Sequence, residues 1–389
     1  MKLFLLFLLS LSLLSGEQTF SAEAEIAKMK AEYEAMKKEQ TKSFDRYKVD
    51  LETEYKAYQD ELKKYWKNPS LSSQKEWISY SVDNKSRSKV DFENDKLVIE
   101  VIAKDKEDAY KLLKERLAYV VSKNTQEVIK SDPLQSKIAQ LVQKDESISI
   151  SIDNKPILQT VIFDKEPSKE ELEKYTQKVV DTTSLKTEKS LFPYKNVYSL
   201  SVNLPKDTTL KRSRVYKTEI VKNANRFEIP IPLVFAIMHT ESNFNPFAKS
   251  HIPAYGLMQI VPKSAGRDVY RFLYKKDGMP SATYLYNSKN NIEMGSVYLH
   301  ILYYRYLKKI KNPESRLYCS IAAYNTGAGN IAWAFTQTHN MNLATPKINS
   351  MSPDEVYKHL LLNLKYDEPK HYLKRVKKRM SVYKKAYNL

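Results

Sequence analysis

The chain has 389 residues, of which 42% are hydrophobic, so it is long and apolar enough for two domains with cores of their own. Its formal net charge of +18 favours polyanionic surroundings. Its single cysteine, Cys319, excludes an intrachain disulfide. Because Cys319 lies in an otherwise apolar helical stretch, we interpret it as a packed core thiol.

The N-terminus has the pattern of an export signal. Lys2 provides a minimal positive region, and Leu3 to Leu14 form an almost continuous apolar stretch. This stretch is too short to span a bilayer as an ordinary helix, and no later segment is long and apolar enough. We therefore expect residues 1–24 to be a signal peptide, with an uncleaved anchor as the alternative.

Residues 25–68 are rich in Lys and Glu, with apolar and aromatic residues at a spacing that approximates a helical stripe. The stripe is interrupted around Gln40, so a sustained heptad pattern is not established. A coiled-coil arm and a helix lying on the next domain both stay open as interpretations, and neither implies chemistry.

From about residue 70 the pattern changes to short apolar runs separated by polar turns. These runs predict strands at 77–82, 88–92, 97–102, 157–163 and 195–204. Leu112, Leu113, Leu117 and Val120 recur at helical spacing and predict a helix from about 106 to 123. We interpret residues 69–205 as an α+β domain with an antiparallel sheet. It contains no clustered His, Cys or carboxylates, so we assign it binding or positioning instead of catalysis.

The remaining residues, 206–389, predict a mainly α-helical domain that begins with an amphipathic linking helix. Further helices are expected at 231–241, 262–273, 291–308, 316–324, 353–365 and 370–386. Six of the seven glycines lie between Gly256 and Gly329, so this half of the chain is the one that needs the backbone freedom of glycine.

Glu241 stands at the end of an unusually apolar helical run. Pro230 suits the start of that helix, and Asn243 and Pro246 suit its end. A carboxyl in this setting is partly desolvated and lies at the negative end of a helix dipole, and both effects raise its pKa. Such a group can protonate a glycosidic oxygen. From this residue alone, an ordinary solvated glutamate would be the simpler interpretation.

Two small polar and aromatic segments follow Glu241-Ser242. They are Gly256-Leu257-Met258-Gln259 and Ala323-Tyr324-Asn325-Thr326-Gly327. The glycine of the first segment allows backbone to approach a sugar closely, and the side chain of Gln259 can bind an acetamido group through its amide. Methionines most often fill cores, which is the plain alternative for Met258.

These three segments resemble the catalytic motifs of lytic murein transglycosylases. From Glu241 to Tyr372 the order of segments resembles the membrane-bound lytic transglycosylase C subfamily, and the stretch from Trp77 to Ala103 resembles the N-terminal domain of that subfamily. The resemblance implies an α+β N-terminal domain followed by a mainly α-helical, goose-type lysozyme-like catalytic domain at residues 206–389.

The resemblance also implies roles for individual residues. Glu241 is the expected catalytic acid and base. The expected substrate-binding residues are Ser242, Met258, Gln259, Tyr324, Asn325 and Tyr372. His239 shows no metal-ligand spacing with other His or Cys residues, and we expect neither a metal site nor a cofactor.

The implied reaction cleaves the bond between N-acetylmuramic acid and N-acetylglucosamine and forms 1,6-anhydromuramic acid. Ordinary glycosidases need two carboxyl groups. Asp268, Asp277 and Glu293 are available, but nothing in the sequence places them opposite Glu241. We therefore predict a peptidoglycan lytic transglycosylase with a single catalytic Glu. A lysozyme-type muramidase and a non-catalytic cell-wall-binding protein are the alternatives.

The members of this subfamily are typically lipoproteins, acylated on a cysteine just after the signal, whereas Glu17 stands at that place here. We expect a periplasmic protein without an acyl anchor. Its expected partners are peptidoglycan glycan strands, with peripheral contact to an anionic membrane surface such as that of the outer membrane as a further option. Nucleic acid is not expected at this address. We interpret the basic run from Lys374 to Lys385 as a solvated helix face.

Overall fold

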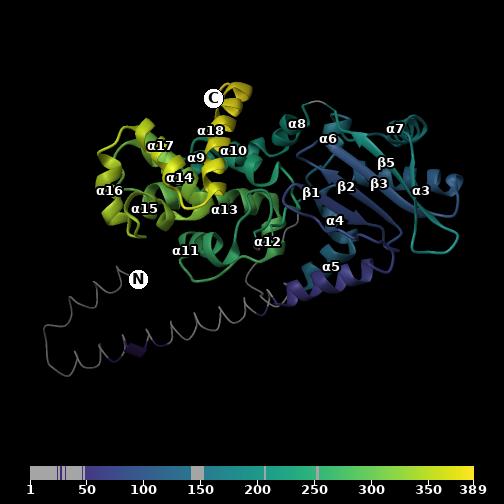
Figure 1. Cartoon of the computed structure of the whole chain (residues 1–389), viewed down its shortest axis with the longest axis horizontal. Coiled ribbons are helices and arrows are strands. Elements are labelled where there is room, and N and C mark those ends of the chain that lie inside the picture. Colours follow the sequence, from purple (N-terminus) through teal and green to yellow (C-terminus); the bar gives the residue numbers. More distant parts are fainter. Residues whose placement is uncertain are drawn as a thin grey trace. The chain divides into compact units, whose positions relative to one another are not determined.

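The computed structural model of the chain describes residues 24, 27, 28, 31, 46, 49–141, 153–205, 207–250 and 254–389 (Figure 1). The chain divides into two units, residues 1–53 and residues 54–389, and the second unit contains every element named below. The predicted signal segment lies outside the described residues except for residue 24, as does much of the predicted helical segment 25–68. None of the described helices combines the length and the apolar character of a membrane span.

The N-terminal part of the larger unit contains a five-stranded sheet. Its strands are β1 (Glu76–Tyr80), β2 (Ser86–Asp91), β3 (Lys96–Ala103), β4 (Lys186–Lys189) and β5 (Asn196–Asn203). They lie in the order β1-β2-β3-β5-β4, and every neighbouring pair is antiparallel. Trp77 pairs with Val90, for example, and Ile99 with Leu200. The antiparallel sheet predicted for this region is confirmed.

Two details of the prediction differ from the structure. The predicted strand at 157–163 is wrong, because this segment contains the short helix α6 (Gln159–Ile162). Its buried residues are Ile157, Leu158 and Val161, and Val161 follows the first two by four and three positions, which is the spacing of a helix face, whereas a strand would bury alternate positions. Strand β4 was not predicted, because all four of its residues are exposed and no alternation of apolar residues marks it.

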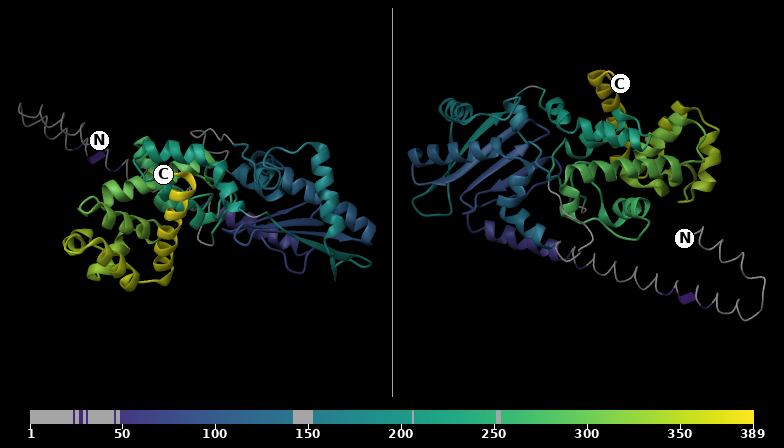
Figure 2. Two further views of the ribbon diagram at one scale, coloured as in Figure 1. Left: turned by 90° about the horizontal axis from the view of Figure 1, so that it is seen from above. Right: turned by 180° about the vertical axis from the view of Figure 1, so that it is seen from behind.

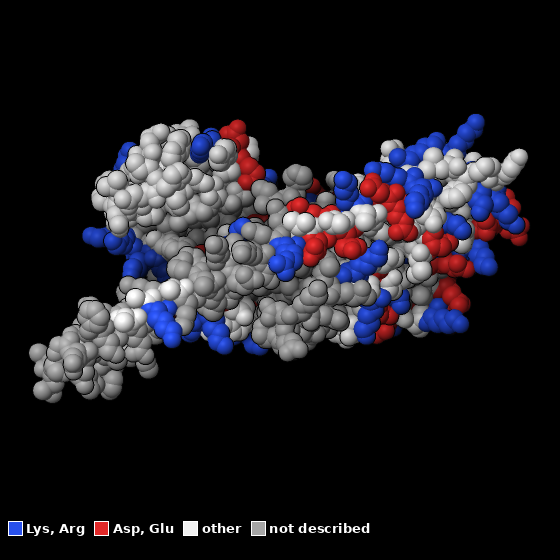
Figure 3. All heavy atoms as spheres, turned by 90° about the horizontal axis from the view of Figure 1, so that it is seen from below, with Lys and Arg blue, Asp and Glu red and all other residues white. Residues whose placement is uncertain are grey.

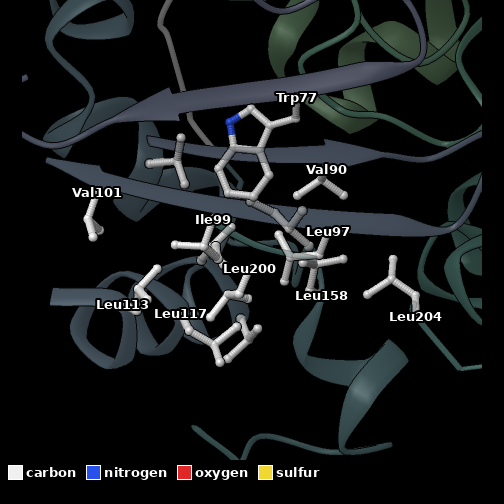
Figure 4. Packing of buried hydrophobic residues seen from close by; sticks show 14 of the residues in the cluster. Trp77, Val90, Leu97, Ile99, Val101, Leu113, Leu117, Leu158, Leu200 and Leu204 are labelled. Atoms are coloured by element: carbon white, nitrogen blue, oxygen red, sulfur yellow. The ribbon is translucent and has the colours of Figure 1, made fainter. Parts of the chain in front are cut away.

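The core of this part lies between the sheet and its helices (Figure 4). Helix α3 (Lys106–Ser122) packs on β2, β3 and β5, and α7 (Lys169–Thr182) packs on α3. Ile99 and Leu200 from the sheet and Leu117 from α3 are fully or almost fully buried in this core. Helix α3 begins after Asp105, whose side chain accepts a hydrogen bond from the backbone N–H of Asp108. Two further helices, α4 (Thr125–Ser131) and α5 (Pro133–Leu141), follow α3.

The C-terminal part of the unit is helical (Figure 2). Its first helices are α8 (Thr208–Val215), α9 (Lys217–Arg226), α10 (Ile231–Ser242), α11 (Arg267–Tyr274), α12 (Ala282–Tyr286) and α13 (Ser288–Ile301). Its last helices are α14 (Pro313–Thr326), α15 (Ala328–Thr336), α16 (Met341–Asn349), α17 (Pro353–Asn363) and α18 (Asp367–Tyr387). Two π-helical turns, η1 (Pro262–Gly266) and η2 (Leu302–Tyr306), precede α11 and follow α13. An α+β region followed by a mainly helical region is the predicted fold class, which is confirmed.

The linking helix expected over 206–227 is two helices, α8 and α9. The break falls at Tyr216, which is buried and stacks on Phe244 with ring centroids 6.4 Å apart. The break turns the chain so that α9 packs against α10, the helix that carries Glu241.

The segment just after α10 joins the helical part to the sheet. The side-chain amide of Asn245 donates to the backbone carbonyls of Ser73 (3.3 Å) and Glu76 (3.4 Å). Phe247 packs on Trp77, with ring centroids 5.6 Å apart, and belongs to the core of the N-terminal part. The end of the helix that carries the predicted acid is therefore fastened directly to the first strand of the sheet.

Candidate active site

Helix α10 carries Glu241 in its last turn. Pro232 lies in the first turn, where no backbone N–H is required, and residues 233–238 are all buried. Asn243 ends the helix in the left-handed conformation, with φ of 54°. The predicted helix and its end are confirmed. Glu241 itself is partly buried.

The Glu241 carboxyl receives a hydrogen bond from Tyr372. The Tyr372 hydroxyl donates to Glu241 Oε1 at 2.6 Å, and this tyrosine of α18 is 1% exposed. Burial raises the pKa of Glu241 to about 7, although the Tyr372 hydrogen bond and the Lys75 ammonium oppose that rise. A group with this pKa holds a proton in about half of the molecules near neutral pH, so it can both donate and accept one.

The loop from Tyr255 to Ile260 is shaped by one glycine. Gly256 has φ of 74°, and a Cβ at this position would lie 2.3 Å from the Leu285 carbonyl oxygen. Only glycine fits both the backbone conformation and the space. The close approach that Gly256 permits is therefore to the protein's own backbone at α12, and not to a ligand.

The side chain of Asn291, in α13, holds the same loop through hydrogen bonds. It is fully buried, its Oδ1 accepts from the Met258 backbone N–H at 2.7 Å, and its Nδ2 donates to the carbonyls of Tyr255 and Leu285, each at 2.8 Å. Each of these three hydrogen bonds joins the Asn291 amide to a backbone group of the protein itself. The sequence alone assigns no role to Asn291.

Met258 is a core residue in the structure. Its side chain is fully buried against Gly295, where a Cβ would meet the Met258 sulfur at 2.2 Å. The predicted contact of the Met258 side chain with substrate is therefore not supported, because the side chain fills a gap between the loop and α13. Its backbone still contributes to the site, since the Met258 carbonyl accepts a hydrogen bond from the Tyr324 hydroxyl at 2.8 Å.

Gln259 presents one unpaired acceptor. Its Nε2 donates to the carbonyls of Ala248 (3.0 Å) and Gly256 (2.9 Å), which fixes the orientation of the amide. Its Oε1 is buried and has no hydrogen-bond partner within the described parts of the chain. A buried acceptor without a partner costs free energy unless a ligand supplies the donor.

Tyr324 and Asn325 end α14 and are both partly buried. The Tyr324 ring packs edge-on against Tyr298 with centroids 5.4 Å apart. Burial, and then the charge of Glu241, raise the pKa of Tyr324 well above its usual range. Gly327, with φ of 86°, ends the helix in open space. The structure thus brings Tyr324 and Tyr372 to the same carboxyl from two different helices.

Ser242 has a different place from the one predicted. It is fully buried, and its hydroxyl donates to the Leu257 carbonyl at 2.7 Å and to the Met238 carbonyl at 3.1 Å. Direct contact of Ser242 with a substrate is excluded by this burial. The residue instead fastens the end of α10 to the loop that carries Gln259.

The other carboxylates that the sequence left open are engaged elsewhere. Asp277 forms ion pairs with Arg267 and Arg271, which together hold its pKa well below its usual range. Asp268 accepts from the Tyr306 hydroxyl at 2.8 Å.

Two more acidic residues have arginine partners. Glu293 pairs with Arg226 at 2.7 Å. Glu368 is the acidic side chain whose charge acts on Glu241, but it is itself exposed and pairs with Arg375 at 3.8 Å. Asp132 is another described carboxyl whose pKa is raised by burial, but it precedes α5 in the α+β part, where its Oδ1 accepts from the backbone N–H groups of Leu134 and Gln135.

Lys75 is the residue at this site that sequence reasoning missed. It precedes β1, and its ammonium donates to the Thr240 carbonyl at 2.6 Å and to the His239 carbonyl at 3.3 Å. No local pattern could indicate this contact, because Lys75 and Thr240 are 165 positions apart in the sequence.

His239 shows no sign of a ligand role. Its Nδ1 bonds the Tyr383 hydroxyl at 2.9 Å, and burial together with the nearby Arg379 lowers the pKa of His239 to about 2, so the ring is neutral. Among the residues that the structure describes, no group of three or more His, Cys, Asp or Glu side chains gathers in one place. Cys319 is fully buried in α14, as predicted for a core thiol.

The basic run of α18 is largely solvated. The helix buries Tyr372, Leu373, Val376 and Tyr383 and turns most of its lysines outward. Arg379 is an exception, since it donates to the Thr240 hydroxyl at 2.9 Å. Over the α+β part, the face seen in Figure 3 shows basic and acidic side chains interspersed, not gathered by sign.

A cavity of about 290 Å³ lies at the opposite end of α10. Ile229, Pro230 and Leu233 line it together with Tyr303 and Tyr304. Leu233 and Glu241 are separated by about 12 Å along the helix axis, so this apolar cavity is remote from the shielded carboxyl.

These features define a class of protein: a helical domain in which a shielded glutamate at a helix end accepts a hydrogen bond from Tyr372, and the next residue, Ser242, joins that helix end to a glycine-bearing loop. The family model for the transglycosylase SLT domain matches residues 219–345, which include Glu241, Gln259 and Tyr324.

Comparison with known proteins extends the match to most of the chain. The membrane-bound lytic murein transglycosylase C of Sodalis glossinidius is 31% identical over 309 residues, which are 79% of this chain and 82% of that one. The protein of the same name from Salmonella arizonae is 30% identical over 82% of this chain and 85% of its own length. The chain belongs to the membrane-bound lytic murein transglycosylase C family and is an enzyme of the lytic transglycosylase class.

Among solved structures, the 70 kDa soluble lytic transglycosylase of Escherichia coli is 24% identical and covers 46% of this chain and 26% of its own. Its TM-score is 0.36, so the family assignment depends on the sequence comparisons.

Proposed function

We propose that this chain cleaves the β-1,4 bond between N-acetylmuramic acid and N-acetylglucosamine in peptidoglycan and releases 1,6-anhydromuramic acid ends. The observation that carries the proposal is the single shielded carboxyl of Glu241, which has a pKa of about 7 and a hydrogen bond from Tyr372. One group that holds a proton near neutral pH and can take one back suits a reaction that needs an acid and then a base.

In the first step, protonated Glu241 gives its proton to the glycosidic oxygen, and the bond from that oxygen to the anomeric carbon of muramic acid breaks. The 2-acetamido group of the substrate stabilises the positive charge at that carbon. The hydroxyl of Tyr372 stabilises the Glu241 carboxylate that results, because a hydrogen bond to the charged form is stronger than one to the neutral form.

In the second step, the Glu241 carboxylate removes the proton from the C6 hydroxyl of the same muramoyl residue. The C6 oxygen attacks the anomeric carbon and closes the anhydro ring. Glu241 is protonated again and ready for the next turnover, and no water is consumed. This sequence of steps requires one carboxyl, whereas hydrolysis by ordinary glycosidases requires two.

Substrate binding is assigned to the loop that Ser242 joins to the end of α10 and to the end of α14, which contacts that loop through Tyr324. Gln259 Oε1 is a buried acceptor that lacks a partner in the described part of the chain, so we assign it to an acetamido N–H. The partly buried Tyr324 and Asn325 at the end of α14 are assigned to the sugar rings. Ser242 and Met258 support this surface from within, through Leu257 and Tyr324.

A lysozyme-type muramidase is the second candidate, and Glu368 is the residue that supports it. Its charge acts on Glu241, and it is exposed enough to activate a water. Its ion pair with Arg375 and its exposure speak for a solvated side chain instead. The mass of the products separates the two reactions, because hydrolysis adds one water and leaves a reducing end.

The experiment that tests the proposal is the substitution Glu241→Gln, assayed on purified sacculi. We expect turnover to fall at least about 100-fold, the usual contribution of a general acid and base, while binding to sacculi is retained. Glu293→Gln in α13 is the matched control and should keep full turnover. Full turnover of Glu241→Gln would refute the proposal, and loss of both turnover and binding would favour a folding defect, which circular dichroism would reveal.

We place this reaction in the periplasm. The support comes from the export-signal pattern of the N-terminus and from relatives whose names describe membrane-bound proteins. Peripheral contact with an anionic membrane surface is part of the same proposal and fits the net charge of +18. Fractionation of cells that express the full chain tests both statements, since recovery in the cytoplasm would contradict them.

A further inference from the structure

Lys75 reaches the last turn of α10 from outside the helical part of the chain. It directly precedes strand β1, and its ammonium donates to the Thr240 carbonyl at 2.6 Å and to the His239 carbonyl at 3.3 Å. These two carbonyls belong to the residues just before Glu241. The N-terminal part of the unit thus contributes a cation to the helix end that holds the acid.

A cation is favoured at this point for a general reason. The last carbonyls of a helix have no partner within the helix and carry a partial negative charge. The His239 carbonyl receives the Asn243 N–H at 3.1 Å, so it is partly satisfied by the chain itself. The Thr240 carbonyl receives Lys75, whose contact is the shorter of its two.

The backbone around Lys75 is held in place on both sides. The Phe92 N–H donates to the Lys75 carbonyl at 2.9 Å. The Asn245 amide, four residues after Glu241, donates to the carbonyls of Ser73 and Glu76. The loop that follows the acid and the segment that carries the cation therefore fasten each other, and Asn245 is itself fully buried.

We propose that Lys75 is a positioning residue for the transglycosylase reaction: its ammonium fixes the end of α10 and stabilises the Glu241 carboxylate that forms when the proton passes to the substrate. This inference rests on the proposed role of Glu241. It gives the α+β region a part in the chemistry, because the reaction then depends on a charge that comes from the edge of its sheet.

The other charged and titratable groups around Glu241 come mainly from one helix. Tyr372, Glu368 and Arg375 face it from α18, and Tyr324 faces it from α14. Arg375 favours the carboxylate and Glu368 disfavours it, and these two pair with each other. Arg379 of α18 also reaches this helix end, where it donates to the Thr240 hydroxyl at 2.9 Å. Lys75 and Arg379 are thus the two cations at the end of α10 that no ion pair within the described chain joins to an acidic residue.

Lys75 is charged at neutral pH. Burial and the nearby Arg379 lower the pKa of Lys75 to about 8, while Glu241 and Glu93 oppose that fall. At pH 7 most molecules therefore carry the ammonium, which can act on Glu241 throughout the reaction. Lys75 is partly buried, so the protein holds this cation in a partly shielded place.

The substitution Lys75→Met removes the charge and keeps most of the aliphatic stem, whereas Lys75→Arg keeps the charge. Lys89→Met is the control, because Lys89 lies in the adjacent strand β2 and, among the residues that the structure describes, forms an ion pair with Glu76 alone, at 2.6 Å. Turnover on sacculi, thermal unfolding and the pH dependence of kcat/KM are measured for all three variants and for the unmodified chain.

For Lys75→Met we expect kcat to fall about tenfold with little change in KM, the rate equivalent of one pKa unit of carboxylate stabilisation. The fall of kcat/KM on the basic side should move to higher pH by on the order of one unit, the low end of the effect of a neighbouring opposite charge. Lys75→Arg should keep kcat and the pH profile close to those of the unmodified chain, and Lys89→Met should change neither kcat nor the pH profile. A role in folding alone would lower the unfolding temperature of Lys75→Met and leave the pH profile in place, which would overturn the inference.

A direct titration of Glu241 separates this inference from the proposed function. Infrared difference spectra between each chain and its Glu241→Gln counterpart report the protonated carboxyl without any need for activity. The midpoint should be higher in Lys75→Met than in the unmodified chain, and an unchanged midpoint would overturn the inference. If Lys75→Met does not fold, Lys75→Gln, which keeps a donor for the Thr240 carbonyl, is titrated in its place. Full activity of Glu241→Gln would refute the acid assignment itself.

Discussion

Asn291 offers the sharpest test of how the site is built, because it does not touch the acid. Its amide makes three hydrogen bonds to backbone groups, at 2.7 Å to Met258 and at 2.8 Å to Tyr255 and Leu285. The substitution Asn291→Ala leaves the Met258 N–H and the Leu285 carbonyl without this partner, whereas the Tyr255 carbonyl keeps the Ile260 N–H at 3.2 Å. At about 1 to 2 kcal/mol for each of the two unsatisfied groups, the expected loss is about 2 to 4 kcal/mol.

That loss is a large part of the total stability of an ordinary domain, which is about 5 to 15 kcal/mol. Urea unfolding followed by circular dichroism measures it, and the midpoint should fall with little change in slope. Turnover should fall as well in the molecules that stay folded. The Met258 segment, whose carbonyl receives the Tyr324 hydroxyl, loses its support when Asn291 is removed.

Asn363→Ala is the matched control. Asn363 is exposed, and its amide donates at 3.0 Å to the His359 carbonyl within the same helix. Its removal should change stability by no more than about 0.5 kcal/mol. If Asn291→Ala were as stable and as active as Asn363→Ala, the claim that α13 holds the Gly256 to Gln259 loop in its active form would be refuted.

Four further outcomes follow from the site. Tyr372→Phe removes the donor to Glu241 Oε1, so the pKa of Glu241 should rise. Turnover should fall by about tenfold or more, because a charge-assisted hydrogen bond is worth about 1.5 to 3 kcal/mol. A pH profile of turnover identical to that of the unmodified chain would contradict this prediction. For the unmodified chain, kcat/KM should be highest below pH 7 and fall as the pH rises through about 7, because the free enzyme must hold a proton on Glu241; a profile that rises through this range would indicate a base in the first step. Glu368→Gln should still yield anhydro ends, and their replacement by reducing ends or a complete loss of activity would point to a second catalytic carboxylate. Glu241→Gln should be more stable to urea than the unmodified chain at pH 8. The raised pKa of Glu241 in the folded state means that the unmodified chain loses stability as the pH rises from about 4.5 to about 7. If the difference in stability between the two chains were the same at pH 5 and at pH 8, the pKa shift would be contradicted.

Much of the fold was predictable where the local pattern and the tertiary environment agree. Helix α10 has an apolar run on every side because residues 233–238 are all buried, and its prolines and Asn243 mark its ends. Strand β3 alternates buried and less buried residues, which its place in the sheet requires. Strand β4 and helix α6 show the limit, since the first is wholly exposed and the second is too short to show a period.

The candidate site was predictable in part for a similar reason. The resemblance between short segments indicated Glu241 and Tyr372, and the structure joins them by a hydrogen bond. The resemblance could not distinguish side chains that face the acid from those that support it. Met258 and Ser242 stand in the same segments as the site residues, but the structure buries both in the core. Lys75 was missed because its contact depends on how the sheet meets the end of α10, which no local pattern encodes.

The central claim is that one shielded carboxyl transfers a proton twice and that water takes no part. The purified protein digests sacculi in water enriched in the heavy isotope oxygen-18, and the sugar ends are identified by mass spectrometry. We predict anhydromuramic ends that contain no solvent oxygen, and no such ends with Glu241→Gln. Reducing ends labelled with heavy oxygen would contradict the account, because they would require an attacking water and a second group to activate it.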